Sequence, residues 1–139
     1  MSRVVLDCSV CMGWCFESEA DVYTDAVLRA MPRATALVPA IWPLEVANVL
    51  LVAERHRRIT RADAARFLEL LGALRIVVEP SIEVGDLGFL LALARERRLS
   101  AYDAAYLRLA LREHAALASR DRGLRAAARA AGVAEFAPR

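Results

Sequence analysis

The sequence predicts a three-layer α/β/α fold with a central, mostly parallel sheet of four to five strands. Short apolar segments alternate with longer segments of helical periodicity, and this alternation is typical of parallel strands joined by right-handed helical crossovers. Of the 139 residues, 58% are hydrophobic and 26% are charged, which excludes a disordered or fibrous chain. We therefore expect a single domain over residues 1–139.

Five segments have the pattern of strands. Each is a short apolar run bounded by proline, glycine or polar residues. They are residues 3–7, 34–38, 76–79, 116–119 and, as an edge strand, 133–136. The first run ends in Asp7, and an acid that closes an apolar strand is expected to be buried and to need a partner.

Helices are expected between these strands. Their ranges are 12–16, 19–31, 43–56, 60–74, 82–97, 100–113 and 122–131. Pro43 suits the first turn of its helix, and Gly132 ends the last one. Thr60 and Ser100 are each followed three residues later by an aspartate, which is the pattern of a capping box.

The composition excludes several classes of site. All 19 positive charges are arginines, so no site that depends on a lysine, such as a Walker-A loop or a Schiff base, is present. No Gly-x-Gly-x-x-Gly follows a strand, which argues against a dinucleotide fold. The only histidines, His56 and His114, lie away from strand ends, which argues against Ser-His-Asp or Cys-His catalysis.

Cys8, Cys11 and Cys15 share one face of a helix. A fourth metal ligand is missing, so we interpret them as small apolar residues. The chain opens without a signal-peptide pattern and has no apolar run of about 18 residues. We expect a reduced, cytoplasmic protein with no membrane association.

Four acids from separate segments are expected at one edge of the sheet. Asp7 and Asp121 follow strands, Glu45 lies in the first turn of the helix after the second strand, and Asp103 lies in the first turn of another helix. In parallel sheets this carboxyl-terminal edge binds ligands. Four carboxylates repel one another unless a cation neutralises them, and Mg²⁺ or Mn²⁺ is the natural choice.

Such a cation binds a scissile phosphate and lowers the pKa of water, so the pattern indicates metal-dependent phosphodiester hydrolysis. Ser9, Asn48 and Ser119 are expected to orient the carboxylates or water. A structural role is the alternative for each acid: Asp103 and Asp121 also suit helix caps, and Glu45 suits a helix dipole.

Four motifs resemble those of PIN-domain ribonucleases, and in particular the VapC-type toxins of bacterial toxin–antitoxin modules. They are Val5-Leu6-Asp7-Cys8-Ser9, Leu44-Glu45-Val46-Ala47-Asn48, Leu99-Ser100-Ala101-Tyr102-Asp103-Ala104-Ala105-Tyr106 and Ala118-Ser119-Arg120-Asp121. The resemblance covers nearly the whole chain in the same order. The Glu-x-x-Asn and Tyr-Asp-Ala-x-Tyr elements are its most specific parts.

The resemblance implies a PIN-like fold and RNA cleavage that depends on Mg²⁺ or Mn²⁺. It places the acidic quartet on Asp7, Glu45, Asp103 and Asp121, the hydroxyl position on Ser119 and the amide position on Asn48. It also implies a homodimer that is inhibited by a cognate VapB-type antitoxin. Two departures are visible: Cys8 replaces a usual Ala, Ser or Thr, and Ser119-Arg120 replaces threonine and an apolar residue. Neither removes an acid.

Several arginines are candidates for contacts with RNA phosphates. Arg120 and Arg122 flank Asp121, and Arg55 and Arg57 belong to a basic cluster at a helix end. For the cluster, the alternative is a favourable interaction with the helix dipole.

Two other functions stay open. In a non-catalytic binding module, the acids would serve only as caps. An aspartate-nucleophile phosphatase would use Asp7, but it usually needs an acid at the position of Ser9 and a lysine that this chain lacks.

Overall fold

The computed structural model describes residues 2–138 and contains a four-stranded sheet in which all neighbouring strands are parallel. The strand order is β3-β2-β1-β4. The strands are β1 (Ser2–Leu6), β2 (Ala34–Val38), β3 (Ile76–Val78) and β4 (Ala116–Ala118). The expected α/β fold with a central parallel sheet is therefore confirmed.

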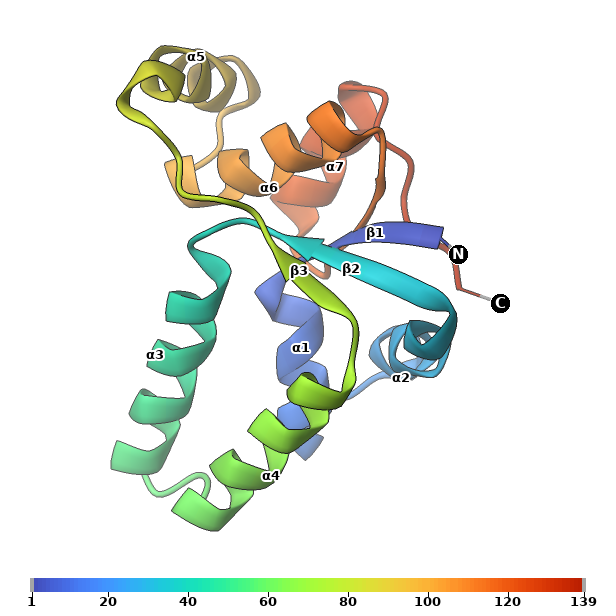
Figure 1. Ribbon diagram of the computed structural model, residues 1–139, viewed down its shortest axis with the longest axis vertical. Helices are drawn as coiled ribbons and strands as arrows, with labels where there is room; N and C mark the ends of the chain where they lie inside the picture. Colours follow the sequence, from blue (N-terminus) through green and yellow to red (C-terminus); the bar gives the residue numbers. More distant parts are fainter. Residues whose placement is uncertain (1, 139) are drawn as a thin grey trace.

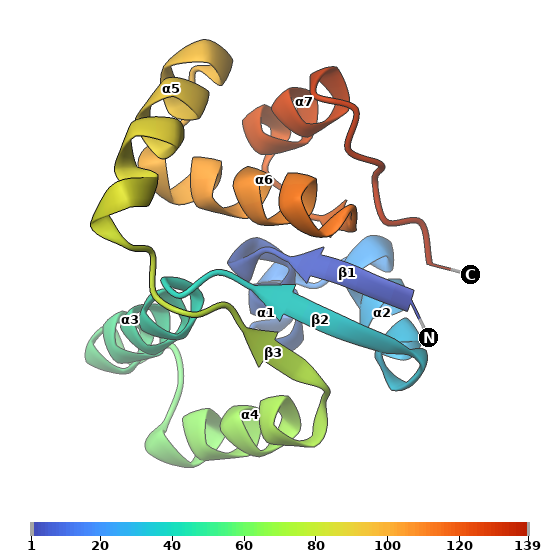
Figure 2. The same ribbon diagram turned by 45° about the horizontal axis from the view of Figure 1, so that its top comes forward.

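Seven α-helices flank the sheet in the described residues. They are α1 (Cys8–Cys15), α2 (Val22–Ala30), α3 (Trp42–Arg55), α4 (Arg61–Ala73), α5 (Leu87–Arg97), α6 (Ala101–Glu113) and α7 (Arg122–Ala130). Figures 1 and 2 show α5, α6 and α7 on one side of the sheet and α1 to α4 on the other. No helix within residues 2–138 has both the length and the apolar character that crossing a membrane requires.

The centre of the core is formed by β1 and α6. Val4, Val5 and Leu6 are completely buried, as expected for a central strand that is covered on both faces. Tyr106 and Leu107 of α6 are also completely buried. This packing fixes the start of α6 beside the carboxyl-terminal edge of the sheet.

Two helices begin elsewhere than the sequence indicates. Helix α1 begins at Cys8 rather than at residue 12, because Asp7 has an extended backbone and its carbonyl accepts a hydrogen bond from the N–H of Val10 at 3.1 Å. Helix α2 begins at Val22 rather than at residue 19. Asp21 and Thr24 form a capping box there, and a separate 3₁₀ turn (Glu17–Glu19) precedes it.

Two further expectations need correction. Helix α5 begins at Leu87 rather than at residue 82, after a 3₁₀ turn (Val84–Asp86). The expected edge strand 133–136 is only a single bridge between Leu117 and Glu135. Leu117 donates its N–H to the carbonyl of Ala134 at 2.9 Å, but the pairing does not extend into a ladder. The sheet therefore has four strands.

Gly13 in α1 provides a test of how closely α1 packs against α2. A Cβ atom at Gly13 would lie 2.6 Å from Cγ2 of the fully buried Thr24. Gly13→Ala is therefore expected to destabilise the protein by about 1–3 kcal/mol, as overpacking does. Gly72→Ala in α4 is the control, because nothing lies within 4 Å of its Cβ. It should stabilise the protein by about 0.5–1 kcal/mol. Urea unfolding of both variants measures the two changes, and equal changes would contradict the packing described.

Candidate active site

The structure places the four expected acids at the carboxyl-terminal edge of the sheet. Asp7 directly follows β1, and Asp121 follows the neighbouring strand β4 and begins α7. Glu45 lies in the first turn of α3, and Asp103 lies in the first turn of α6. Two strands and two helices therefore carry one acid each to the same end of the molecule.

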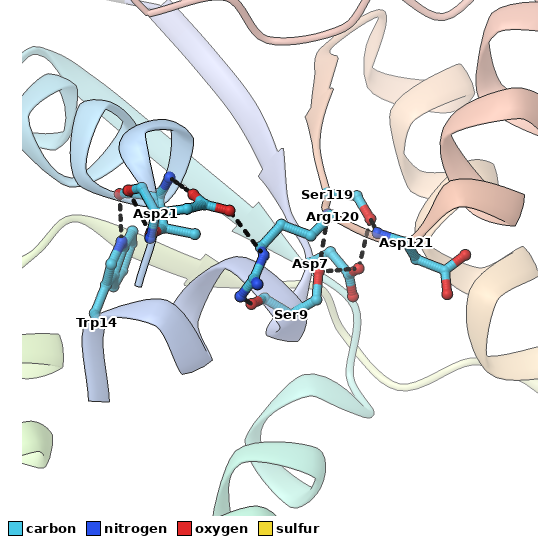
Figure 3. Close-up of polar contacts among 8 residues, drawn as sticks. Asp7, Ser9, Trp14, Asp21, Ser119, Arg120 and Asp121 are labelled. Atoms are coloured by element: carbon cyan, nitrogen blue, oxygen red, sulfur yellow. Dashed lines mark hydrogen bonds and ion pairs between the residues drawn. The ribbon is translucent and has the colours of Figure 1, made fainter. Parts of the chain in front are cut away.

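Asp7 is the buried acid of the site, with 6% of its surface exposed. Its Oδ2 accepts hydrogen bonds from the hydroxyls of Ser9 at 2.8 Å and Ser119 at 2.7 Å (Figure 3). The Ser9 hydroxyl oxygen accepts the N–H of Arg120, and that of Ser119 accepts the N–H of Asp121, both at 3.0 Å. Because each hydroxyl accepts from the backbone, its single hydrogen is directed to Asp7.

Glu45 is half-buried and is held by Tyr106 of α6. The Tyr106 hydroxyl donates to Oε1 of Glu45 at 2.5 Å. Tyr106 is not among the site residues that the sequence predicts. A signal was present, however, because Tyr106 lies three residues after Asp103 and residues at this spacing share a helix face.

Asp103 differs from Asp63, although both are the third residue of a helix after a hydroxyl cap. Thr60 and Asp63 form the complete capping box that the sequence predicts, with hydrogen bonds in both directions. At α6, the N–H of Asp103 donates to the Ser100 hydroxyl at 3.1 Å. The reciprocal bond from the backbone N–H of Ser100 to the carboxylate is not among the hydrogen bonds of residues 2–138. The Asp103 carboxylate therefore does not complete the cap.

Asp121 combines a structural role with its place at the site. Its Oδ1 accepts the N–H of Leu124 at 2.7 Å, so it is the N-cap of α7, which was the structural alternative for this residue. Figure 3 shows its carboxylate extending away from Asp7. The second oxygens of Asp7, Glu45 and Asp121 accept no side-chain hydrogen bond within residues 2–138.

The four acids interact electrostatically. Burial is the largest cause that raises the pKa values of Asp7, Glu45 and Asp103. The charge of Asp121 raises the pKa of Asp7 and of Asp103 further, and the charges of Asp7 and Asp103 raise that of Glu45. The serine and tyrosine hydroxyls described above oppose these shifts by stabilising the ionised carboxylates.

The donor set suits a hard divalent cation, because all four groups offer carboxylate oxygens. Within the described chain, no ion pair reaches any of the four acids. As they stand, no three His, Cys, Asp or Glu side chains of residues 2–138 form a group that could hold a metal ion. The residues are thus chemically suited to a cation, but their side chains are not already arranged around one position.

Arg120 is directed away from the acids. Its Nε lies 3.4 Å from Oδ2 of Asp21, and its Nη1 donates to the carbonyl of Ser9 at 3.5 Å. Figure 3 shows this side chain reaching towards the start of α2. The structure therefore gives Arg120 a role in joining the loop after β4 to α1 and α2.

The other expected residues lie at different distances from the acids. Arg122 is exposed directly after Asp121. Arg55 and Arg57 are exposed at the far end of α3, where Arg55 is about 15 Å along the axis from Glu45. Asn48 is exposed one turn after Glu45, and no hydrogen bond from its side chain is recorded within residues 2–138.

The three cysteines belong to α1. Cys8 and Cys11 are buried, Cys15 is partly buried, and all three are free thiols. Burial, followed by the charges of Glu45 and Asp7, raises the pKa of the Cys8 thiol to about 12. Cys8 and Cys11 therefore pack as small, uncharged core residues.

Comparison with known proteins identifies the family. A family model described as the PIN domain matches residues 4–130. The chain belongs to the PIN-domain family. PIN domains are generally nucleases.

A solved structure supports this assignment at the level of the fold. The PIN-domain chain is similar to the crystal structure of PAE2754 from Pyrobaculum aerophilum, with a TM-score of 0.68 and 24% sequence identity. The similarity covers 96% of this chain and 83% of the other. No curated protein matches the sequence.

The Tyr106→Phe variant tests the hydrogen bond from the Tyr106 hydroxyl to Glu45. The hydroxyl stabilises the ionised carboxylate, so its removal should raise the pKa of Glu45, measured by carbon-13 NMR titration of the side-chain carboxyl. Tyr23→Phe is the control, because it removes a hydroxyl that donates to the carbonyl of Phe136 at 2.9 Å. Both variants should lose about 1 kcal/mol of stability. A Glu45 pKa that is unchanged in Tyr106→Phe would contradict the assigned contact.

The pKa of Asp103 is raised and that of Asp63 is lowered, so replacing each acid should change the pH dependence of stability in opposite directions. The pKa of Asp103 is raised on folding, so its ionised form destabilises the folded state at neutral pH. Asp103→Asn should therefore raise the free energy of unfolding at pH 7 without added metal. This gain should disappear as the pH falls and the wild-type carboxyl becomes protonated.

Asp63→Asn is the matched control, because both variants lose the same interaction with a helix dipole. Hydrogen bonds from Thr60 lower the pKa of Asp63, so this variant should be less stable than wild type at neutral pH. Its deficit should shrink in acid. Thermal unfolding between pH 3 and 7 measures both variants, and a loss of stability in Asp103→Asn would count against repulsion among the site carboxylates.

Proposed function

We propose that this PIN-domain protein is a metal-dependent endoribonuclease that hydrolyses RNA phosphodiester bonds. The observation that carries the proposal is the set of four carboxylates that four separate segments bring to one edge of the sheet, with no ion-pair partner in the described chain. Burial and repulsion by neighbouring carboxylates make the charges of Asp7, Glu45 and Asp103 unfavourable, and a bound divalent cation would offset both.

In the proposed site, Asp7, Glu45, Asp103 and Asp121 would hold Mg²⁺ or Mn²⁺. The cation would supply positive charge for the scissile phosphate and lower the pKa of the attacking water. The hydroxyls that donate hydrogen bonds to Asp7 and Glu45 act on the carboxylates and not on the phosphate. They fix one oxygen of each carboxylate and favour its ionised form, which leaves the second oxygen for the cation or for water.

The chain contains no lysine, and its two histidines lie at helix ends. His56 follows the last turn of α3, and His114 follows the last turn of α6, each at the opposite end of its helix from the acid. General acid–base chemistry is therefore assigned to neither lysine nor histidine, and the carboxylates with the cation that they would hold take this part.

The cellular role that we propose is that of the toxin in a VapBC-type toxin–antitoxin module. It is supported by the order and spacing of the four motifs. The partner would be a VapB-type antitoxin, and an apolar groove between α3 and α4 offers a surface for it, lined in part by Trp42, Val46, Leu50 and Leu68. The exposed Leu87 and Leu91, four residues apart on one face of α5, would suit a homodimer.

Asp7→Asn tests the catalytic assignment. With Mg²⁺ or Mn²⁺, the wild-type chain should cleave RNA, and the variant should lose at least about 100-fold in rate, the upper range for a residue that only orients a ligand. Asp25→Asn, at an exposed position of α2, is the control and should cleave as wild type does. Equal cleavage by wild type and Asp7→Asn would overturn the proposal.

Mn²⁺ should also stabilise the folded wild-type chain, because it binds the folded carboxylate site. A gain of about 2.7 kcal/mol is expected when the free Mn²⁺ concentration is 100 times the dissociation constant. The gain should be much smaller in Asp7→Asn. If Mn²⁺ gives no gain in the wild type and RNA is not cleaved, the chain is a non-catalytic binding module instead.

A further inference from the structure

Tyr102 is an exposed aromatic residue directly beside one of the site acids. It precedes Asp103 in the first turn of α6, and 61% of its surface is exposed. No hydrogen bond of its hydroxyl is recorded within residues 2–138. The ring therefore has no evident part in holding the fold together. Tyr106, in the same helix, is completely buried and holds Glu45.

The spacing of the two tyrosines shows which way Tyr102 faces. Side chains four residues apart lie on the same face of a helix, about 6 Å apart along its axis. Because Tyr106 reaches Glu45, the face of α6 that carries both tyrosines is turned towards the acids. Tyr102 lies one turn closer to the N-terminus of α6, so the helical spacing places its ring at the rim of the site.

A second exposed apolar residue is the sequence neighbour of a site acid. Leu44 precedes Glu45 in α3 as Tyr102 precedes Asp103 in α6, and 67% of its surface is exposed. Single exposed apolar residues are common on protein surfaces. Here, however, both adjoin groups suited to a cation that binds phosphate. A ligand that matches this rim carries a phosphate next to a flat apolar ring, as a nucleotide does.

We propose that the Tyr102 ring stacks on an unpaired base of the RNA next to the scissile phosphate and so positions the RNA in the site. This inference rests on the proposed ribonuclease function and names a residue that positions its substrate. Single-stranded RNA is recognised largely by bases that stack on aromatic side chains. Bases within a duplex are already stacked and paired, so they are not available to Tyr102.

Stacking and phosphate contacts can be separated by their response to salt. An arginine that neutralises a phosphate contributes to the slope of affinity against salt concentration. A stacked tyrosine carries no charge, so its removal should lower the affinity without changing that slope. Arg122, exposed beside Asp121, is the natural comparison for the charged type of contact.

The experiment measures binding of a fluorescently labelled single-stranded RNA to the full chain by anisotropy at several salt concentrations. All proteins carry Asp7→Asn, so that the RNA is not cut. Tyr102→Phe keeps the ring, Tyr102→Leu keeps apolar bulk without it, and Tyr102→Ala removes both. Phe89→Ala is the matched control, because Phe89 is an aromatic residue of similar exposure, 56%, at the other end of α5 from the loop to α6.

Tyr102→Ala should weaken binding of single-stranded RNA by about tenfold, within the range of one lost base–aromatic stack. Its salt slope should match that of the parent. Tyr102→Phe should bind as the parent does, Tyr102→Leu should lose most of the affinity, and Phe89→Ala should lose none. Binding of a duplex of the same sequence should not depend on Tyr102.

Three results would overturn the inference. Parent-like binding by Tyr102→Ala, when the wild-type chain cleaves RNA and Asp7→Asn does not, would remove the stacking role and leave the ribonuclease in place. Equal losses in Tyr102→Phe and Tyr102→Ala would show that the hydroxyl, and not the ring, is the binding group. A wild-type chain that neither binds nor cleaves RNA would overturn both the proposed function and this inference.

Discussion

The burial of the Asp7 carboxylate is the constraint on which the site depends. A carboxylate at the end of a central strand loses most of its hydration, and this loss must be offset by hydrogen bonds. Ser9 and Ser119 supply them, and backbone N–H groups of the loop after β4 orient both hydroxyls. The arrangement ties β1, α1 and the loop after β4 together around one oxygen atom, and the same loop carries Asp121.

Repulsion among the site carboxylates lowers the stability of the folded chain, and the packing of the core offsets this loss. Like charges at the carboxyl edge of the sheet repel one another, while the apolar residues of β1 and α6 are completely buried behind them. Contacts outside the acidic group restrain its loops. Arg120 pairs with Asp21, which also caps α2, so the loop after β4 is fixed from two sides. The acids are thus held at one end of the molecule by the packed core and by contacts such as that of Arg120 with Asp21.

The sequence predicts those parts of the fold that have local signals. Strand β2 has the predicted bounds because Pro32 and Pro39 enclose its apolar run. The start of α1 has no such signal, because Asp7 caps it through its backbone conformation alone. The prediction of an edge strand over residues 133–136 was wrong, because the pairing of this segment stops after one bridge. Local pattern also placed the acids at one edge, but it could not find the contact of Tyr106 with Glu45, or of Arg120 with Asp21, since each joins segments far apart in the chain.

The most direct test of the account is a crystal structure of the full chain grown with Mn²⁺, with the ion located by its anomalous scattering. A shared cation site predicts an anomalous peak at the carboxyl edge of the sheet, with oxygens of Asp7 and of at least one other acid of the quartet coordinating the ion. Oδ2 of Asp7 should also keep both serine hydroxyls. A fully occupied Mn²⁺ bound elsewhere, with the four carboxylates still apart, would contradict the claim that these residues form a single cation site.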